Sequence, residues 1–179
     1  MNPQEKNTYV RKQITKALIS LLNKKKITDI SISELCDKAQ VGRASFYRNY
    51  DSKEEVLQRH TEALIDGWAE DIDKDPSANI YMFFQSLFQH FQKNRSFYGI
   101  LYRQDLSPMI LGAIRKRLQI GPDTEPAVLY SRAFFAYGIF GWIDVWFSSG
   151  MRETPEELNR IILNNLNDLI IGAKSIDTL

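Results

Sequence analysis

Residues 31–55 constrain the fold of this chain more than any other stretch, because their pattern predicts short helices in close succession. Ser31 and Glu34 have the spacing of a capping box, in which the serine hydroxyl and the glutamate side chain satisfy the first backbone N–H groups of a helix. We therefore expect a helix over residues 31–38.

A tight turn and two further helix starts follow in the same segment. Residues 39–42 end in glycine and indicate the turn, after which a helix is predicted over residues 43–50. Ser52 and Glu55 repeat the capping-box spacing, so another helix is expected to begin there. Two short helices joined by such a turn predict a helix-turn-helix. The apolar residues that would form its core are Ile32, Leu35, Ala39, Val41, Phe46 and Tyr50.

In the rest of the chain, apolar residues recur at spacings of three and four, and this pattern also predicts helices. We expect an all-α fold of about nine helices, with a three-helix head on a larger helical bundle. The predicted division is a head of residues 1–51 and a C-terminal domain of residues 52–179, which one long helix connects without a flexible linker. The predicted helices cover about 8–25, 31–38, 43–50, 52–73, 77–93, 95–102, 107–118, 125–149 and 154 onward. Thr154 and Glu157 have the spacing of a third capping box at the start of the last one.

Charge is unevenly divided along the chain, although the net charge is only +1. Residues 1–60 hold 12 Lys and Arg against 7 Asp and Glu, whereas residues 61–179 hold 11 against 15. A basic head on an acidic body indicates a polyanionic partner for the head. Uneven charge on a solvated surface explains the same numbers, so charge alone leaves both interpretations open.

The helix predicted over residues 43–50 has one outward face if Phe46 and Tyr50 point inward. That face would be available to the major groove of DNA, where arginine can donate to guanine and asparagine can pair with adenine. Side chains at the nearby helix starts would meet phosphate. A solvated face is the alternative for Arg43 and Arg48. The residues predicted to contact DNA are Ser31, Ser33, Arg43, Ala44, Ser45, Tyr47, Arg48, Asn49 and Lys53.

The run VGRASFYRNYDSKEEVL, residues 41–57, closely resembles the helix-turn-helix signature of the TetR family of bacterial transcription regulators. The resemblance reaches back to the first helix and covers about the first 60 residues. It implies a DNA-binding regulator, a dimeric repressor released by a small apolar or aromatic effector, with an activator as the alternative. Gly42 departs from the family pattern, which often has Ser or Thr there, and glycine makes no side-chain bond at a helix cap.

The helix predicted over residues 125–149 is apolar nearly all round, so we expect a second chain to cover part of it. Gly138 and Gly141 would allow close approach of helices. Residues 137–158 also resemble a broad TetR subgroup that includes regulators of dihydroxyacetone kinase genes. In the family, the last two helices of two subunits form a four-helix interface, which implies a homodimer on a near-palindromic operator. The interface residues predicted in this way are Gly138, Gly141, Val145, Ile161, Ile162, Leu166, Leu169 and Ile170.

The C-terminal domain contains more aromatic residues than a core of its size needs. They could line an apolar pocket between helices, in which hydroxyl and indole groups form hydrogen bonds with a ligand, or they could belong to the hydrophobic core. The resemblance to effector-binding regulators favours the pocket. The residues predicted to line it are Trp68, Phe84, Phe88, Phe91, Tyr98, Tyr102, Phe135, Tyr137 and Trp142.

The sequence carries no pattern typical of an enzyme, and we predict no catalytic activity, cofactor or metal. Its two histidines, His60 and His90, have no metal-ligand cluster around them, and a phosphate-binding loop and a nucleophile elbow are both missing. A single cysteine, a polar N-terminus and a longest apolar stretch of only residues 133–143 predict a cytoplasmic protein without a membrane partner. The competing interpretation is a helical adaptor or co-regulator that binds a protein instead of DNA.

Overall fold

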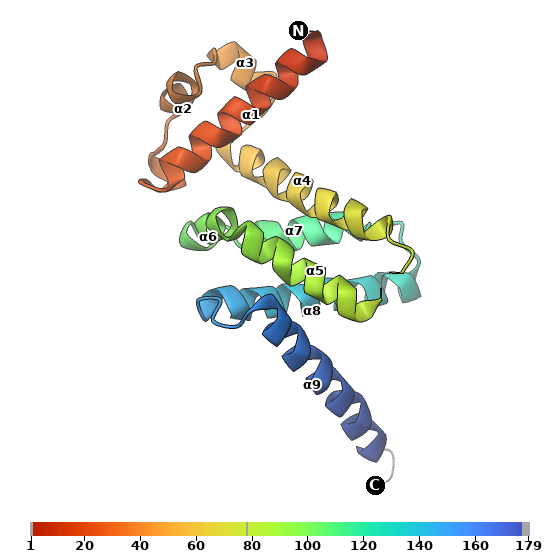
Figure 1. The fold of residues 1–179 in the computed structure, drawn as a ribbon. Coiled ribbons are helices and arrows are strands. Elements are labelled where there is room, and N and C mark those ends of the chain that lie inside the picture. Colours follow the sequence, from red (N-terminus) through yellow and green to blue (C-terminus); the bar gives the residue numbers. More distant parts are fainter. Residues whose placement is uncertain (1, 78, 177–179) are drawn as a thin grey trace.

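The computed structural model describes residues 2–77 and 79–176, and the side chains of residues 2, 4–77 and 79–165. Within these ranges the chain forms nine α-helices, one short 3-10 helix and no strand (Figure 1), which confirms the predicted all-α fold. The elements are α1 (Pro3–Leu22), η1 (Ile27–Asp29), α2 (Ile32–Ala39), α3 (Arg43–Tyr47), α4 (Lys53–Asp73), α5 (Ile80–Lys93), α6 (Arg95–Arg103), α7 (Pro108–Arg117), α8 (Pro126–Ser148) and α9 (Pro155–Ile176).

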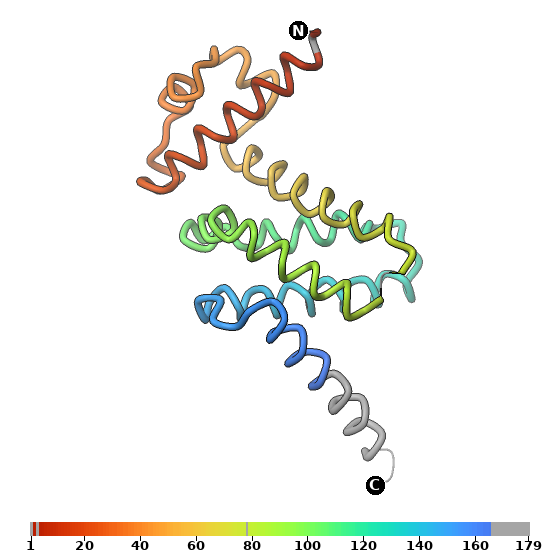
Figure 2. Tube along the Cα trace, viewed as in Figure 1, coloured from red at the N-terminus to blue at the C-terminus, as the bar shows by residue number. Residues whose placement is uncertain are grey.

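The helices are arranged in three parts along the molecule. Helices α1, α2 and α3 form a head at one end, and α4 leads from that head into the body (Figure 1). Helices α5 to α8 lie against one another and against α4 in the body. Helix α9 starts beside α5 and leads away from the bundle on the side opposite the head (Figure 2).

The predicted capping boxes are only partly formed. Ser31, Ser52 and Thr154 each accept a hydrogen bond from the backbone N–H three residues further on, so each begins a helix as predicted. Of the three glutamates, only Glu157 also accepts the N–H of the capping residue, at 2.9 Å. The other two glutamates make different contacts, although their helices start at the predicted positions.

The first helix starts earlier and ends earlier than predicted. Asn2 and Glu5 form a reciprocal capping box, with distances of 2.8 and 2.9 Å, and Pro3 occupies the first helical position. A proline is tolerated there because its missing N–H would have no partner inside the helix. Helix α1 therefore begins at Pro3, five residues before its predicted start, and ends at Leu22.

Helix α8 is buried on only one side by its own chain. Its inward residues are Ala136, Ile139, Ile143 and Trp146. They face the body, where Trp146 meets the ring of Phe88 on α5 at a centroid distance of 5.7 Å. The opposite side of α8 is apolar as well, and within a single chain it faces solvent.

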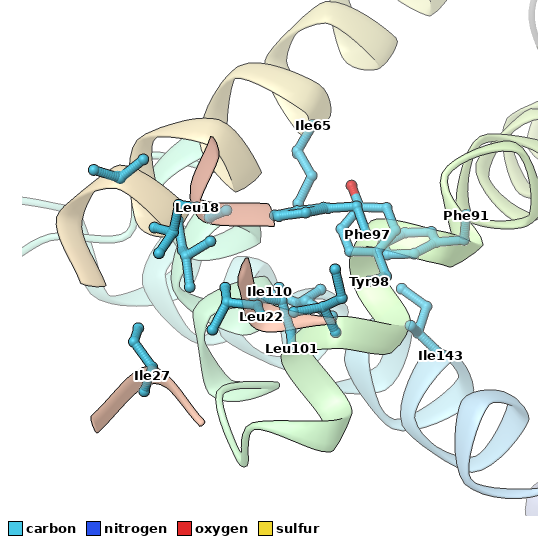
Figure 3. Packing of buried hydrophobic residues seen from close by; sticks show 14 of the residues in the cluster. Leu18, Leu22, Ile27, Ile65, Phe91, Phe97, Tyr98, Leu101, Ile110 and Ile143 are labelled. Atoms are coloured by element: carbon cyan, nitrogen blue, oxygen red, sulfur yellow. The ribbon is translucent and has the colours of Figure 1, made fainter. Parts of the chain in front are cut away.

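The head and the body share one hydrophobic cluster. Figure 3 shows Leu18 and Leu22 of α1 in the same buried group as Leu101 of α6 and Ile110 of α7. Polar contacts accompany this packing, because Gln104 accepts the N–H of Ile27 at 2.9 Å and donates to the carbonyl oxygens of Leu22 and Lys25. The body therefore holds the segment between α1 and α2 directly.

Candidate functional site

The outward face of α3 is short, basic and exposed. Phe46 is fully buried and fixes which way the helix faces, whereas Arg43, Ala44 and Tyr47 are exposed. Arg48 follows as the C-cap and is also exposed, with one guanidinium nitrogen donating to the hydroxyl of Ser45 at 2.8 Å. Two arginines beside a tyrosine can donate to base edges and phosphates.

The prediction that Asn49 belongs to this outward face is wrong. Its side chain is 6% exposed. Its carbonyl oxygen accepts from Arg11 Nε of α1 at 2.9 Å, and its amide nitrogen donates to the backbone oxygen of Ser45 at 2.8 Å. Helix α3 ends at Tyr47, three residues before its predicted end, and Asn49 ties that end to α1.

Lys53, predicted to contact phosphate at a helix start, is already engaged within the chain. Its ammonium group donates to the backbone oxygens of Ile27 and Ile30, both at 2.6 Å. It thereby satisfies one carbonyl group at each end of η1, and one of its three N–H donors remains for another partner. Ser31 and Ser33 are exposed at the start of α2, as the prediction of phosphate contacts requires.

A cavity lies between α4, α5, α7 and α8, with about 180 Å³ of internal space. Ten apolar or aromatic residues and two charged ones form its wall. The charged pair is Asp73, the last residue of α4, and Arg117, the last residue of α7, which form an ion pair. The described residues that line it are Ile65, Trp68, Ala69, Asp73, Phe83, Leu87, Phe91, Ile114, Arg117, Leu118, Phe135 and Ile139.

Three of the nine residues predicted to line a pocket, Trp68, Phe91 and Phe135, line this cavity. The prediction of Tyr137 as a pocket residue is wrong, because it lies on the outward side of α8 and is 53% exposed. Trp142 lines a separate hollow between α8 and α9. The other four, which pack in the core around the cavity, are Phe84, Phe88, Tyr98 and Tyr102.

The prediction of a pocket from aromatic residues alone omitted most of the residues that line the cavity. One detectable signal was the spacing of Ile65, Ala69 and Asp73, which recur every four residues and therefore share one stripe of α4. Asp73 at the end of that stripe and Arg117 in the basic last turn of α7 carry no local sign of a cavity, since charged residues are common at helix ends. That the two ends meet is a consequence of packing α4 against α7, which no local pattern reveals.

An uncovered apolar stripe runs along the outward side of α8. Phe134 is 83% exposed, and Tyr130, Tyr137 and Val145 are also exposed. Gly138 is exposed in the same stripe, and Gly141 is partly exposed. At spacings of three and four residues, these side chains occupy one face of the helix.

The predicted dimer-interface residues of α9 have different surroundings. Ile161 is exposed, as a contact with another chain requires, but Ile162 is buried in its own chain. The prediction of Ile162 as an interface residue is therefore wrong for the side chain as the structure places it. The side chains of Leu166, Leu169 and Ile170 lie outside the described residues.

Two other kinds of site are absent from the described residues. No helix in the described part of the chain is long and apolar enough to cross a membrane. Residues 2–77 and 79–176 also contain no group of three or more His, Cys, Asp or Glu side chains that could hold a metal ion.

Two family models match the sequence, and together they cover both parts of the fold. Residues 14–59 match the model described as "Bacterial regulatory proteins, tetR family". Residues 78–168 match the model described as "Transcriptional regulator C-terminal region", one of the C-terminal models of the same family. A search of curated proteins finds no match.

Two solved structures show the same fold. Lin0861 from Listeria innocua has a TM-score of 0.77 at 15% sequence identity, over 94% of this chain and 95% of that chain. A TetR transcriptional regulator from Streptococcus agalactiae 2603V has a TM-score of 0.58 at 20% identity, over 90% of this chain and 95% of that chain. At these identities the likeness concerns the fold alone.

Proposed function

The chain belongs to the TetR family of transcription regulators and has a DNA-binding helix-turn-helix domain, and from this premise we propose that it is a dimeric repressor that a small apolar effector releases from its operator. The observation that carries the proposal is the exposed basic face of α3, with Arg43, Tyr47 and Arg48 directed away from the buried Phe46. We assign DNA binding to residues 1–51, and effector binding and dimerisation to residues 52–179.

Pairing of two chains supplies a second head, so that the dimer has two DNA-binding helices α3. A single α3 of five residues reaches few base pairs, and regulators of this type gain specificity from two half-sites related by two-fold symmetry. The outward stripe of α8 supports this assembly, because an apolar patch along a helix of 23 residues is costly to leave in water. Two copies of the stripe, with Phe134 and Val145 facing their counterparts, would cover each other.

Helix α4 connects the effector cavity to the reading head. Its first residue, Lys53, holds the segment before α2, and its last residue, Asp73, lies at the cavity. A ligand that moves the end of α4 relative to α7 would change the separation of two heads in a dimer. The ligand can lower the affinity for the operator at most by the ratio of its own affinities for the two arrangements of the dimer.

The decisive experiment is a selection of DNA fragments by the purified full chain, starting from the intergenic DNA beside its own gene. We expect a near-palindromic site, bound by two chains, with an affinity at least about a thousandfold above that for unrelated DNA. Equal affinity for all fragments would refute sequence-specific binding and favour the adaptor that acts through a protein. Transcription that rises with the bound regulator would identify an activator.

A further inference from the structure

The cavity between α4, α5, α7 and α8 has the size of a single aromatic ring with a short substituent. Its volume is about 180 Å³, and an apolar cavity of about 150 Å³ in another protein is known to hold benzene. Because Asp73 at one end is 64% exposed, the cavity opens to solvent there, and a larger effector would leave part of its surface in water. The volume therefore favours a ligand whose buried part is no larger than one ring with a short substituent.

Aromatic side chains form one wall of this cavity. The rings of Trp68 and Phe83 meet edge to face with centroids 5.3 Å apart, and Phe83 and Phe135 follow at 5.7 Å. The indole N–H of Trp68 already donates to the Ser86 hydroxyl at 3.1 Å, so it does not offer a free donor to a ligand. These three side chains present edges and faces that suit a further ring.

Among the described residues, the Asp73–Arg117 ion pair is the only charged part of the wall, and its two members are unequally exposed. The Asp73 side chain is 64% exposed, whereas that of Arg117 is 34% exposed. Asp73 can therefore turn into water at little cost, while Arg117 stays beside the cavity, where its guanidinium group can bind another anion. The group that can replace an aspartate on an arginine, with the same charge and the same two-oxygen geometry, is another carboxylate.

We propose that this cavity binds an aromatic monocarboxylate with one ring and a short linker, whose carboxylate takes the place of Asp73 on Arg117. The ring lies against Trp68, Phe83 and Phe135, and the carboxylate closes the charged end of the cavity. Because the exchange breaks an ion pair between α4 and α7, the ligand also frees the end of α4. The effect on DNA rests on the proposed function, whereas the binding itself does not.

The test compares three probes of nearly equal shape, 3-phenylpropanoate, 3-phenylpropanamide and 3-phenylpropylamine, by calorimetry and Trp fluorescence with the DNA-free full chain. We expect the acid to bind about tenfold tighter than the amide, a difference of about 1.4 kcal/mol. Tighter binding of the amine would mean that Asp73 is the recognising group and would overturn the proposal. Equal binding of all three probes, or binding of none, would overturn it too.

Two variants locate the recognition, and a third is the matched control. Arg117→Gln should abolish the preference for the acid, whereas Asp73→Asn should tighten acid binding because the competing carboxylate is gone. Lys116→Gln breaks the neighbouring ion pair between the same two helices, with Glu62, but Lys116 does not line the cavity. An acid preference that survives in Arg117→Gln, with thermal unfolding confirming that each variant is folded, would refute the assignment.

Operator binding is measured separately, with and without 3-phenylpropanoate. A chain that binds DNA but not the acid would leave the proposed function standing and remove the ligand class. A chain that binds the acid but no DNA would do the reverse.

Discussion

The side-chain oxygen of Gln104, just after α6, accepts a hydrogen bond from the backbone N–H of Ile27, in the segment that leads into the helix-turn-helix. The same side chain donates to the carbonyl oxygens of Leu22 and Lys25 at 3.4 and 3.0 Å. One glutamine thus satisfies three backbone groups between the end of α1 and the start of η1. The head is fixed to the body through α6 as well as through the continuous helix α4.

Removal of this glutamine should loosen the head. We expect Gln104→Ala to lower the free energy of unfolding by about 1–3 kcal/mol, because partly buried backbone groups lose their partners. The Ile27 amide should exchange with solvent faster, which hydrogen-exchange measurements detect. Gln104→Glu keeps the acceptor for Ile27 and should protect that amide more than alanine does. Unchanged exchange in Gln104→Ala would show that the contact does not hold the segment.

Substitutions of Arg43 and of Asn49 should weaken DNA binding in different ways, the first on particular sequences and the second on all. Arg43→Ala should relax base preference at one operator position, at a cost of about 1–3 kcal/mol on the preferred sequence. Asn49→Ala removes hydrogen bonds to Arg11 and Ser45, so it should lower the free energy of unfolding and weaken binding equally on all sequences. Anisotropy titrations on operators with single base changes separate the two. A loss of base preference in Asn49→Ala would restore it as a reading residue.

Gly42 leaves room for a better cap. It has the extended backbone of an N-cap, and a Cβ built there meets nothing within 4 Å. Gly42→Ser should therefore raise the free energy of unfolding by a few tenths of a kcal/mol by bonding a free N–H of α3. The control is Gly150→Ser, which should destabilise by about 1–2 kcal/mol because the φ of Gly150 is +85°. Urea unfolding compares both; destabilisation by Gly42→Ser would reveal a strain that the open space does not suggest.

Phe134 should control the pairing of two chains. Its symmetric counterpart would lie in the same interface, so Phe134→Asp introduces a charge twice into an apolar contact. We expect the dimer dissociation constant to rise by about thirtyfold or more, about 2 kcal/mol. Sedimentation at micromolar concentration measures it, with Tyr9→Asp, on the exposed surface of α1, as the control. A Phe134→Asp chain that remains dimeric would place the interface elsewhere.

His90 should make stability depend on pH. Burial, with a smaller effect of Lys93, lowers the pKa of His90 from 6.5 to about 4, and its ring lies 2.8 Å from the Tyr98 hydroxyl. The folded state therefore binds fewer protons than the unfolded state, so this stabilisation is complete above pH 6.5 and is lost as the pH falls towards 4. Because His90 is not completely buried, we expect a contribution of about 2 kcal/mol.

The measurement is urea unfolding of the wild type and of His90→Gln at pH 7.5 and pH 5. Glutamine is neutral at both values and can accept from Tyr98. The wild type should therefore lose more stability than the variant on acidification. Equal losses would show that another group, such as His60 with its pKa lowered by burial, is responsible.

Local patterns predicted the starts of α2, α4 and α9 well, because a cap depends on neighbouring residues. Ser31, Ser52 and Thr154 each accept the predicted N–H, whatever their glutamates do. The inward orientation of Asn49 could also have been predicted from its position relative to Phe46. It lies about 60° round an ideal helix from the buried Phe46, and therefore nearer the inward face than the outward one.

The cavity and the interface depend on long-range packing and were predicted less well. Aromatic content identified Trp68, Phe91 and Phe135, but which rings line a gap is decided by how four helices fit together. Because α8 is apolar on nearly every side, its sequence indicated that one side is not covered by its own chain, but not which side. Only the packing of Ile139 and Ile143 into the body leaves Tyr130 and Phe134 outside.

Ile27 is held from two directions, its N–H by Gln104 and its carbonyl oxygen by Lys53. Mutants that no longer respond to an inducer, or that respond without one, need not map to the operator-reading helix or to the effector cavity. A genetic screen for altered induction should also recover substitutions at these three positions. Their phenotypes would reflect the linkage between the two functions, with each function intact when it is assayed alone.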